Sequence, residues 1–365
     1  MNDRLKIAIN TGGGDAPGLN AVIYAVTMAA ERRGWEVYGI HTGYKGLLDT
    51  DLITRLTPEK VCGIVSLGGT ILGTTNKGDP FNMPVKNAVG DVECRDVSGK
   101  ILSNFKRLGL DVLIAVGGDG SLRLAHRFAQ LGMPIIGVPK TIDNDLASTL
   151  VTFGFDTAVT TSTEAIDKLH STASAHQRVM VVEVMGRYAG WIALNSGISG
   201  SADVILVPEI PFTMESVCEK IMDNELHGKD YGIVVVAEGA KALGGQMITK
   251  GAGEEGRQEV LLGGIGEWVA KEIHKRTGKD TRSLVLGHLQ RGGSPTTFDR
   301  LIALRFGAAA VRFIAEGQRN VMVANQPPTM VPVPLAEAAE KMKSVPLDSD
   351  SILTARDLGI SFGDE

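Results

Sequence analysis

The chain has 365 residues and a mass of 38.7 kDa, enough for about two domains with hydrophobic cores of their own. Hydrophobic residues make up 43% of the sequence and charged residues 22%, which excludes a disordered chain and a membrane bundle. The net charge is −5, so no overall positive field would attract nucleic acid, and any phosphate-binding site must be built locally.

The cysteines and the first residues bear on the cellular compartment. Cys62, Cys94 and Cys218 lie far apart and form no CxxC pair, which argues against a disulfide framework and a zinc site. Residues 1–10 contain no apolar stretch long enough for a signal peptide, and no run of 18 apolar residues occurs in the sequence. We therefore expect a cytoplasmic protein with no membrane partner and no nucleic-acid partner.

Short apolar runs alternate with longer amphipathic segments, a pattern typical of parallel strands joined by helices. In the first part of the chain, strands are predicted at 6–10, 36–40, 112–116 and 134–138, with a helix at 19–33. The pattern begins again after 139–145, with helices near 157–171 and 265–275 and strands at 178–184, 203–207, 233–237 and 283–286. The expected fold class is α/β, with two Rossmann-like lobes, mainly parallel sheets, flanking helices and an active site in the cleft between the lobes.

These elements also predict the domain organisation. The first lobe comprises residues 1–139 together with about 292–325, and the second lobe comprises residues 140–291. Residues 239–266 are rich in glycine and glutamate and are expected to begin as an exposed, mobile loop. Residues 326–365 contain five prolines and are expected to form a tail that packs on the surface.

A glycine-rich loop, Thr11-Gly12-Gly13-Gly14-Asp15-Ala16-Pro17-Gly18, connects the first predicted strand to the first helix. Glycines there let backbone N–H groups approach an anion, and the helix N-terminus adds a favourable dipole. The alternative is a tight turn with no ligand. The loop matches neither GxGxxG nor GxxxxGK[ST], which weakens the case for a simple dehydrogenase or a Walker-type ATPase.

Acidic residues follow two of the predicted strands. Asp119, in Gly117-Gly118-Asp119-Gly120-Ser121, stands where ligands of open sheets bind and could hold Mg²⁺ or instead cap a helix. Asp143 and Asp145, in the segment 139–145, project to the same side if that segment is extended. One carboxylate could then accept a proton from an attacking hydroxyl while the other orients it, the alternative being an Asp-rich and Asn-rich turn.

Isolated basic residues form the last group of candidates. Arginine binds phosphate through two parallel hydrogen bonds, so several arginines that converge on one phosphate would overcome the unfavourable net charge. Surface solvation is the alternative for any single arginine, and it is less convincing for Arg187 and Arg291, which stand beside glycines. The candidates are Arg178, Arg187, Arg282, His288 and Arg291.

Taken together, these segments closely resemble the 6-phosphofructokinase family, and the similarity extends to about residue 320. Five motifs occur in the family's order: GGDAPGLN, GGDGS, PKTIDND, HQR followed by EVMGRYAG, and GHLQRGGSP. The resemblance implies a two-lobed kinase that transfers a phosphoryl group from ATP, with Mg²⁺, to the 1-hydroxyl of fructose 6-phosphate in glycolysis. It also implies that the first lobe binds the donor and the second lobe binds the sugar phosphate.

The resemblance carries catalytic roles onto particular residues. Asp143 would be the general base, Thr141 and Arg187 would stabilise the transferring phosphoryl group, and Asp145 would be a further catalytic residue. Asp119 would carry Mg²⁺, and Gly13 with neighbouring amides would cradle the donor phosphates. The remaining donor contacts implied are Lys77, Gly120, Ser121 and Lys140, and the remaining sugar contacts within one subunit are Ile142, Met185, Gly186, Glu238, Leu289 and Gln290.

The family's site is shared between subunits. The sugar's 6-phosphate is gripped by an arginine pair lent by a neighbouring subunit, here Arg178 and Arg282, together with His288 and Arg291. The resemblance therefore implies a homo-oligomer of even order, a dimer or a tetramer, whose monomer would be nearly inactive.

Two residues bear on the phosphoryl donor. Pyrophosphate-using members of the family typically have Asp where this chain has Gly120, and an Asp side chain would occupy space and repel the α-phosphate of ATP. Lys140, in contrast, is the residue of the pyrophosphate users. A lysine can add a contact without excluding a nucleotide, so Gly120 decides for ATP, with pyrophosphate as the alternative.

The chain departs from the family pattern in places. The arginine after GGTxLGS is absent from residues 68–77, so Lys77 is expected to supply a cation instead. Tyr24 and Met28 replace arginines that bind effectors in allosteric members, so absent or altered effector control is expected. A catalytically silent relative is a further alternative, although Asp143 is present, and an NAD kinase or lipid kinase is remote because both lack PKTIDND and GHLQRGG.

Overall fold

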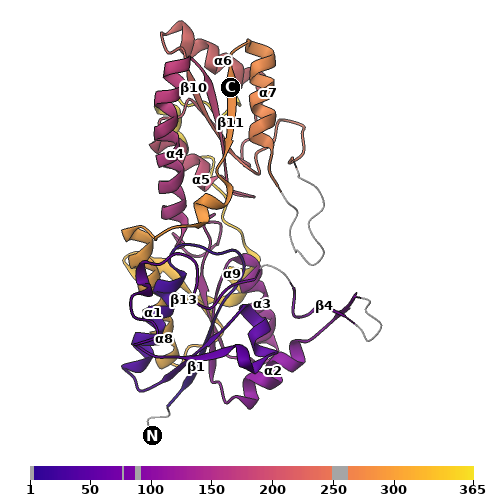
Figure 1. Ribbon diagram of the computed structural model, residues 1–365, viewed down its shortest axis with the longest axis vertical. Coiled ribbons are helices and arrows are strands. Elements are labelled where there is room, and N and C mark those ends of the chain that lie inside the picture. The colour runs from indigo at the N-terminus through magenta and orange to yellow at the C-terminus, as the bar shows by residue number, and fades with distance from the viewer. Residues whose placement is uncertain (1–3, 76–77, 87–91, 249–261) are drawn as a thin grey trace.

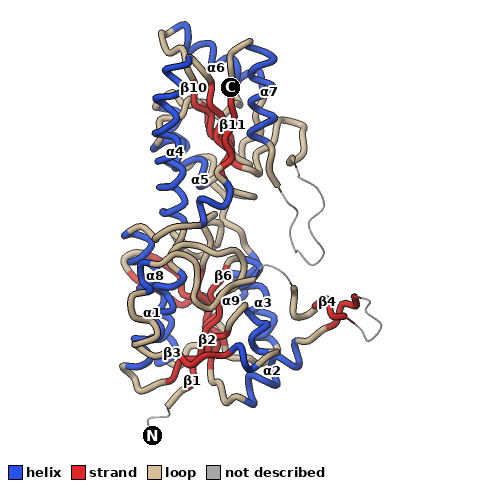
Figure 2. The backbone as a smooth tube through the Cα atoms, in the orientation of Figure 1, coloured by secondary structure: helices blue, strands red, loops and turns tan. Residues whose placement is uncertain are grey.

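The computed structural model describes residues 4–75, 78–86, 92–248 and 262–365, which form two stacked α/β lobes (Figure 1). Within the described residues, the first lobe contains a seven-stranded sheet of order β13-β12-β7-β6-β1-β2-β3, and the second contains a four-stranded sheet of order β11-β8-β10-β9. Figure 2 draws the strands of both sheets in red and the helices that cover them in blue. The expected α/β class, with mainly parallel sheets and flanking helices, is confirmed.

The large sheet is parallel in its centre and has an antiparallel strand at each edge. Neighbouring residues of its central strand face opposite cores, since Ile7 and Ile9 join one cluster of buried residues and Ala8 joins another. The strands are β1 (Lys6–Thr11), β2 (Glu36–Ile40), β3 (Ile53–Leu56), β6 (Val112–Gly117), β7 (Ile135–Pro139), β12 (Val321–Gln326) and β13 (Thr329–Pro334).

Helices cover both faces of this sheet, as the two-sided burial of its strands requires. One face carries α1 (Leu19–Glu31) and α8 (Thr297–Ala315), and the other carries α2 (Ser98–Arg107), α3 (Asp119–Gln130) and α9 (Leu335–Glu340). A hairpin of β4 (Met83–Lys86) and β5 (Val92–Arg95) projects from this lobe (Figure 1).

The small sheet is parallel throughout and also has a helical layer on each face. Its strands are β8 (Val179–Val184), β9 (Val204–Leu206), β10 (Gly232–Ala237) and β11 (Thr281–Val285). The helices α4 (Phe155–His176), α5 (Trp191–Ser199) and α10 (Asp350–Asp357) contribute to one core, and α6 (Met214–Leu226) and α7 (Ile265–Thr277) to the other.

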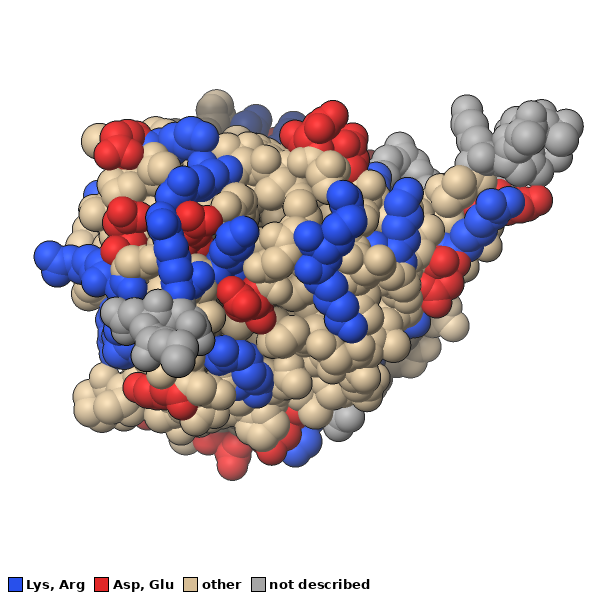
Figure 3. All heavy atoms as spheres, turned by 90° about the horizontal axis from the view of Figure 1, so that it is seen from below, with Lys and Arg blue, Asp and Glu red and all other residues tan. Residues whose placement is uncertain are grey.

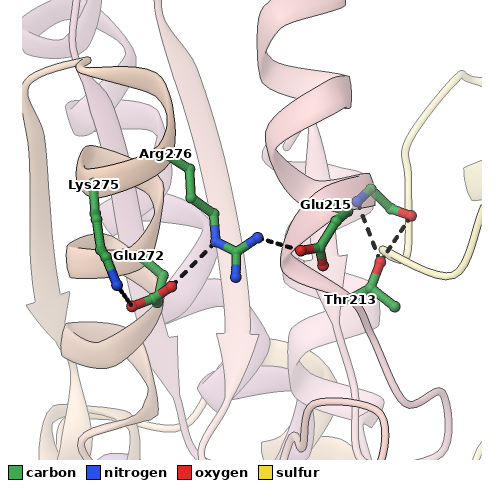
Figure 4. A network of polar contacts seen from close by, with 6 residues as sticks. Thr213, Glu215, Glu272, Lys275 and Arg276 are labelled. Atoms are coloured by element: carbon green, nitrogen blue, oxygen red, sulfur yellow. Dashed lines mark hydrogen bonds and ion pairs between the residues drawn. The ribbon is translucent and has the colours of Figure 1, made fainter.

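A polar network joins the outer helices of the second lobe (Figure 4). Arg276 of α7 donates from Nε to Glu272 of its own helix at 3.1 Å and from Nη1 to Glu215 of α6. Thr213 caps α6 by accepting the N–H of Ser216 at 3.2 Å, which satisfies one of the free amides of the first turn. These contacts fix α6 against α7 on the solvent side of the sheet.

Asp299 connects the two lobes. It lies in α8 of the first lobe, and its Oδ2 accepts both the N–H (2.7 Å) and the hydroxyl (2.6 Å) of Thr157 in α4 of the second lobe. Burial raises the pKa of this carboxyl to about 6, although the bonds from Thr157 oppose that rise. The side chain therefore holds the first turn of α4 against the first lobe, close to where the lobes meet.

The final segment corrects one expectation, because residues 326–365 are more than a surface tail. β13 extends the large sheet, α9 packs on α3, and the chain then crosses to the second lobe, where Phe362 is completely buried. The prolines fit this arrangement since Pro332 and Pro334 lie in β13, an edge strand, where a missing N–H is tolerated.

The expected mobile loop at 239–266 has its central residues, 249–261, outside the described residues. Seen from below, the surface of the first lobe carries intermingled basic and acidic side chains rather than a field of one sign (Figure 3). Among the described helices, none combines the length and the apolar character that a membrane crossing requires.

Candidate active site

The carboxyl ends of both sheets face a common cleft of roughly 440 Å³, within the usual size range of ligand sites. Parallel strands present their carboxyl ends on one side, so the loops that follow β1, β6, β7, β8 and β10 converge there. Of the residues expected to act, the cleft is lined by Gly13, Asp119, Gly120, Ser121, Lys140, Thr141, Asp143, Asp145, Met185, Arg187, Glu238, His288 and Arg291.

The glycine loop after β1 is fixed by backbone hydrogen bonds. The N–H of Gly12 donates to Val116 O at 2.9 Å, and the N–H of Gly13 donates to Thr75 O at 3.0 Å. Thr74 Oγ1 in turn donates to Gly13 O at 2.6 Å. The amide of Gly13 is thus already used within the loop, so its role as a phosphate donor needs a rearrangement of this contact.

The same glycines leave room for two cations. A Cβ atom built at Gly14 would lie 2.8 Å from Nη1 of Arg291, and one at Gly13 would lie 3.4 Å from Nζ of Lys140. Gly13 also has a φ of +78°, which side-chain-bearing residues rarely adopt. These glycines therefore let the guanidinium and the ammonium approach the loop backbone closely.

Lys140 is a buried cation under the glycine loop. Only 3% of the residue is exposed, and its Nζ donates to the carbonyl of Gly14. Burial lowers the pKa of Lys140 to about 8, and the charge of Arg291 acts in the same direction, while Asp143 and Asp145 oppose it. Two neighbouring cations at this position form a local site for an anion in a chain of negative net charge.

Four carboxyl groups surround the same space, two from the turn after β7 and one each from the segments after β6 and β10. Burial raises the pKa of Asp145 to about 7, and the nearby charges of Asp143 and Asp119 add to that rise. Burial likewise raises the pKa of Glu238, after β10, to about 7, with Asp143 contributing and Arg187 opposing. Asp143 influences both carboxyl groups and Lys140, so it lies at the centre of the cluster.

The backbone of residues 141–145 directs these carboxylates. The N–H of Asp143 donates to Thr141 Oγ1 at 3.0 Å, and Asn144 has a left-handed φ of +52°. The segment is therefore a turn rather than an extended strand. This corrects the assumption from which Asp143 and Asp145 were expected to project to the same side. Both Asp143 and Asp145 nevertheless line the cleft, because the turn returns them to its wall.

Asp119 stands at the start of α3 and is the expected Mg²⁺ ligand. In the structure its Oδ1 accepts the N–H of Gly120 at 2.6 Å, and its Oδ2 accepts from Arg123 at 2.6 Å. Within the described residues, no cluster of three ligand side chains is close enough to hold a metal alone. Mg²⁺ typically uses one or two carboxylates together with substrate phosphates, so the carboxylates at this cleft, including the unpartnered Oδ1 of Asp145, fit such an ion.

The arginine of EVMGRYAG reaches the cleft through close backbone packing. A Cβ atom at Gly239 would lie 1.8 Å from the carbonyl oxygen of Arg187, so only glycine fits after Glu238. The Arg187 guanidinium lies 5.5 Å from the centre of the Tyr188 ring. Arg291 is placed by a bond from Nη1 to Asp15 O at 3.1 Å.

The structure does not bring Arg178 and Arg282 to this cleft. They lie at the amino ends of β8 and β11, the opposite ends from the cleft, and both pair with Asp280. Their guanidinium groups are on the edge of the second lobe, since β11 is the outermost strand of its sheet. A chain of this structure therefore cannot use its own pair in its own cleft.

Several expected sugar contacts lie beside the cleft rather than in it. Ile142 is completely buried in the core of the second lobe, and Leu289 is 68% exposed. Gln290 is also buried, and its Oε1 accepts the N–H of Met185 at 3.3 Å, which supports a neighbour that does line the cleft. Gly186 adopts a φ of +130° beside that residue, and Lys77 falls outside the described residues.

A small cavity that sequence reasoning missed adjoins the donor side of the cleft, with which it shares Thr75, Gly78, Ser121 and Leu124. Tyr44 lines it and stacks on Phe128 with ring centres 4.6 Å apart. Burial raises the pKa of Tyr44, and its hydroxyl has no hydrogen-bond partner. The sequence signal for this cavity was Tyr44, an aromatic residue shortly after β2, but many core residues stand in such a position. The further lining residues include Asn10, Lys45, Pro80, Met83 and Ala115.

Comparison with known proteins agrees with this geometry. A protein from Chloroflexus aurantiacus called ATP-dependent 6-phosphofructokinase is 51% identical, over 99% of this chain and 98% of its own length. A protein from Streptomyces coelicolor called pyrophosphate-fructose 6-phosphate 1-phosphotransferase is 46% identical, over 98% of this chain and all of its own.

Solved structures give the same architecture. The phosphofructokinase of Pichia pastoris in the T-state superposes with a TM-score of 0.79 at 33% identity, over 92% of this chain and 35% of its own longer chain. A pyrophosphate-dependent phosphofructokinase from Marinobacter aquaeolei has a TM-score of 0.78 at 23% identity, over 98% of this chain and 92% of its own, and so shares the fold. The phosphofructokinase family model matches residues 6–314, and the chain therefore belongs to the phosphofructokinase family.

Proposed function

We propose that this protein is an ATP-dependent 6-phosphofructokinase, which transfers a phosphoryl group from ATP to the 1-hydroxyl of D-fructose 6-phosphate and forms fructose 1,6-bisphosphate. The observation that carries the proposal is the single cleft in which the carboxylates of Asp143 and Asp145 face the cations Lys140, Arg187 and Arg291. Such a site suits phosphoryl transfer, in which catalysis consists mostly of positioning and charge neutralisation.

In this mechanism Asp143 accepts the proton of the sugar hydroxyl as the oxygen attacks the γ-phosphorus of ATP, and the bond from that phosphorus to the β–γ bridging oxygen breaks, so that ADP leaves with the electron pair. The electrostatic influence of Asp143 on Lys140, Asp145 and Glu238 supports this role. Thr141 and Arg187 hold the transferring group, and His288 and Arg291 bind the sugar's 6-phosphate. Glu238 accepts hydrogen bonds from the sugar hydroxyls. In this proposal the first lobe binds the donor and the second binds the sugar phosphate.

Mg²⁺ is proposed to bind at Asp119 and to neutralise charge on the donor phosphates, which is the chemistry such an ion supplies in phosphoryl transfer. The chain's own contribution is the placement of carboxylates that repel one another when the ion is absent. That repulsion is visible in Asp145, whose pKa is raised partly by Asp143 and Asp119. An ion between these groups would restore the ionised form of Asp145.

ATP is favoured over pyrophosphate by the space on the donor side. Gly120 lines the cleft without a side chain, so the space that an Asp side chain would fill stays open to the α-phosphate of ATP. Pyrophosphate is the second candidate, and Lys140 favours it because the buried ammonium would bind a compact, highly charged donor. Relatives of nearly the same identity carry names of either kind.

A homo-oligomer, dimer or tetramer, is proposed to complete the site. β11 is an edge strand whose last four residues are exposed, and Leu284 and Val285 among them are apolar, as is the nearby Leu289. Exposed apolar side chains on a sheet edge are typical of an interaction surface. A second copy packed there would bring its Arg178 and Arg282 to the 6-phosphate end of the neighbouring cleft.

The proposal is tested by initial rates with fructose 6-phosphate and Mg²⁺, with ATP and pyrophosphate compared over a concentration range that gives kcat/KM for each. Preference for ATP supports the proposal, preference for pyrophosphate supports the second candidate, and no turnover with either contradicts both. Asp143→Asn should abolish turnover while sugar phosphate binding, measured by calorimetry, is retained. Loss of both would show that Asp143 acts in binding rather than as the base.

A further inference from the structure

The segment that follows α9 contacts the catalytic turn from behind. We call residues 342–345 the C-terminal strap. Met342 forms an antiparallel bridge with Leu146, and the N–H of Lys343 donates to the carbonyl of Asp145 at 2.7 Å. The strap thus pairs with the backbone at Asp145 and Leu146, although the two segments are almost 200 residues apart in sequence.

The side chain of Lys343 makes three more bonds to the same region. Its Nζ donates to Asn144 Oδ1 at 3.0 Å, to Thr149 O at 3.1 Å and to Leu150 O at 2.9 Å. An ammonium group has three donors, so this set uses all of them. Burial lowers the pKa of Lys343 to about 8, while the charge of Asp145 opposes that change.

Asn144 receives hydrogen bonds from both sides. Its Oδ1 accepts the ammonium of Lys343 and also the N–H of Thr152 at 3.2 Å. Asn144 adopts the left-handed φ of +52° and stands between the two cleft aspartates. Fixing this side chain therefore fixes the direction in which Asp143 and Asp145 leave the backbone.

The strap also makes hydrogen bonds to the region around the start of α5. Trp191 Nε1 donates to Lys343 O at 3.1 Å, and the N–H of Val345 donates to Glu209 Oε1 at 2.9 Å. Glu209 also accepts the N–H of Gly190, at 3.0 Å to the same oxygen. Gly190 and Trp191 begin α5, directly after the segment that carries Arg187.

We propose that Lys343 is a positioning residue, which ties the turn that carries the general base to the segment that carries Arg187 and so sets the distance between base and phosphoryl-binding cation. The expected effect of Lys343 on kcat rests on the proposed phosphoryl transfer, whereas its effect on the order of the turn does not. A misplacement of about 1 Å between reacting groups can cost roughly a hundredfold in rate, so the strap should act on kcat.

The test compares Lys343→Met with Lys341→Met. Methionine keeps an unbranched apolar stem in place of the partly buried lysine side chain, whereas Lys341 is an exposed lysine next to the strap and serves as the control. We expect Lys343→Met to lower kcat about ten- to a hundredfold with the KM for ATP changed less than about twofold, and Lys341→Met to leave both unchanged. Lys343→Arg should recover part of the lost kcat, because it restores a charged donor.

A kcat within twofold of wild type for folded Lys343→Met, or an equal loss in Lys341→Met, would overturn the proposal. If Lys343→Met does not fold, Asn144→Gly removes the same bond from its other end and keeps the left-handed backbone. It should lower kcat alone by the same factor, and an unchanged kcat in Asn144→Gly would overturn the proposal.

Hydrogen exchange separates this inference from the proposed function. Amides of residues 141–152 should exchange faster in Lys343→Met than in wild type or Lys341→Met, whatever reaction the protein catalyses. Unchanged exchange there would contradict the strap's role. If exchange is faster in Lys343→Met but the wild-type protein has no phosphofructokinase activity, the role of the strap is supported and the proposed function is refuted.

Discussion

Replacing Asp145 with Asn should stabilise the ligand-free protein while it lowers activity. The side chain is surrounded by other carboxylates and is largely buried, which raises its pKa from the ordinary 3.8 to about 7. A group whose pKa is raised on folding favours the folded state at low pH, and that contribution is lost as the pH rises through the folded-state value. The ionised carboxylate therefore destabilises the fold above pH 7, and a neutral amide of the same shape would not.

The size of the effect follows from the pKa. A rise from 3.8 to about 7 corresponds to about 4 kcal/mol at pH values above both. At pH 8 without Mg²⁺ we expect Asp145→Asn to be more stable than wild type by about 2–4 kcal/mol. At pH 5 the wild-type carboxyl is already protonated in the folded state, so the advantage should shrink by more than half.

Urea unfolding of both proteins at pH 5 and pH 8, at equal protein concentration and without Mg²⁺, measures this difference. Glu267→Gln is the control, since Glu267 is an exposed carboxylate on α7 that pairs with Lys271 and does not line the cleft, and it should not reproduce the stabilisation. Mg²⁺ should reduce the advantage of Asp145→Asn if the ion lies among these carboxylates. Equal stability of Asp145→Asn and wild type at pH 8 would refute the reasoning, as would a loss of stability.

Three further predictions follow from the site. Gly120→Asp should lower kcat/KM for ATP at least about tenfold and affect pyrophosphate less, and equal losses for both donors would contradict the steric argument. The variants Arg178→Ala and Asp143→Asn should each be inactive alone, but an equal mixture that is refolded together should recover up to about a quarter of wild-type activity. Half of the dimers in such a mixture contain one subunit of each kind, and each of these has one intact site out of two. No recovery would mean that sites are not shared. Gly239→Ala should lose activity and melt at a lower temperature in calorimetry, since its Cβ would overlap the Arg187 carbonyl oxygen, and an unchanged protein would show that this loop relaxes freely.

Effector control is the last expectation that a simple assay can check. Tyr24 and Met28 pack against the core of the first lobe, where arginines would be needed to bind an anionic effector from α1. ADP or phosphoenolpyruvate should therefore leave the rate unchanged at fixed substrate concentrations. A strong shift in activity with either compound would refute the expectation of absent or altered effector control.

Local sequence patterns were sufficient to predict many of the strands and the group of residues at the centre of the candidate site. Short apolar runs predicted β1, β6, β7, β8 and β10 within one or two residues, because strands buried on both faces must be apolar throughout. Chemical motifs stood directly after these runs, and parallel strands bring their carboxyl ends together. The convergence of Asp119, Asp143, Arg187 and Glu238 could thus be expected before the lobes were placed.

Other features depend on contacts between distant residues and have no local signature. β13 and α9 looked like an irregular proline-rich tail, because an edge strand needs no continuous apolar run and tolerates proline. The bond from Lys343 to Asn144 spans 199 residues, and nothing around either residue indicates it. The raised pKa of Asp145 likewise requires knowledge of how deeply the turn is buried.

The sequence by itself determined which residue types follow each strand, and with them the family and the candidates for the base and the phosphate-binding cations. Only the tertiary structure decided which of these groups share one cleft, and it placed Arg178 and Arg282 on an outer edge instead. The physical reason is that strand and loop chemistry is encoded by neighbouring residues. Burial, charge coupling and the direction of a side chain are set by segments that come together only when the chain folds.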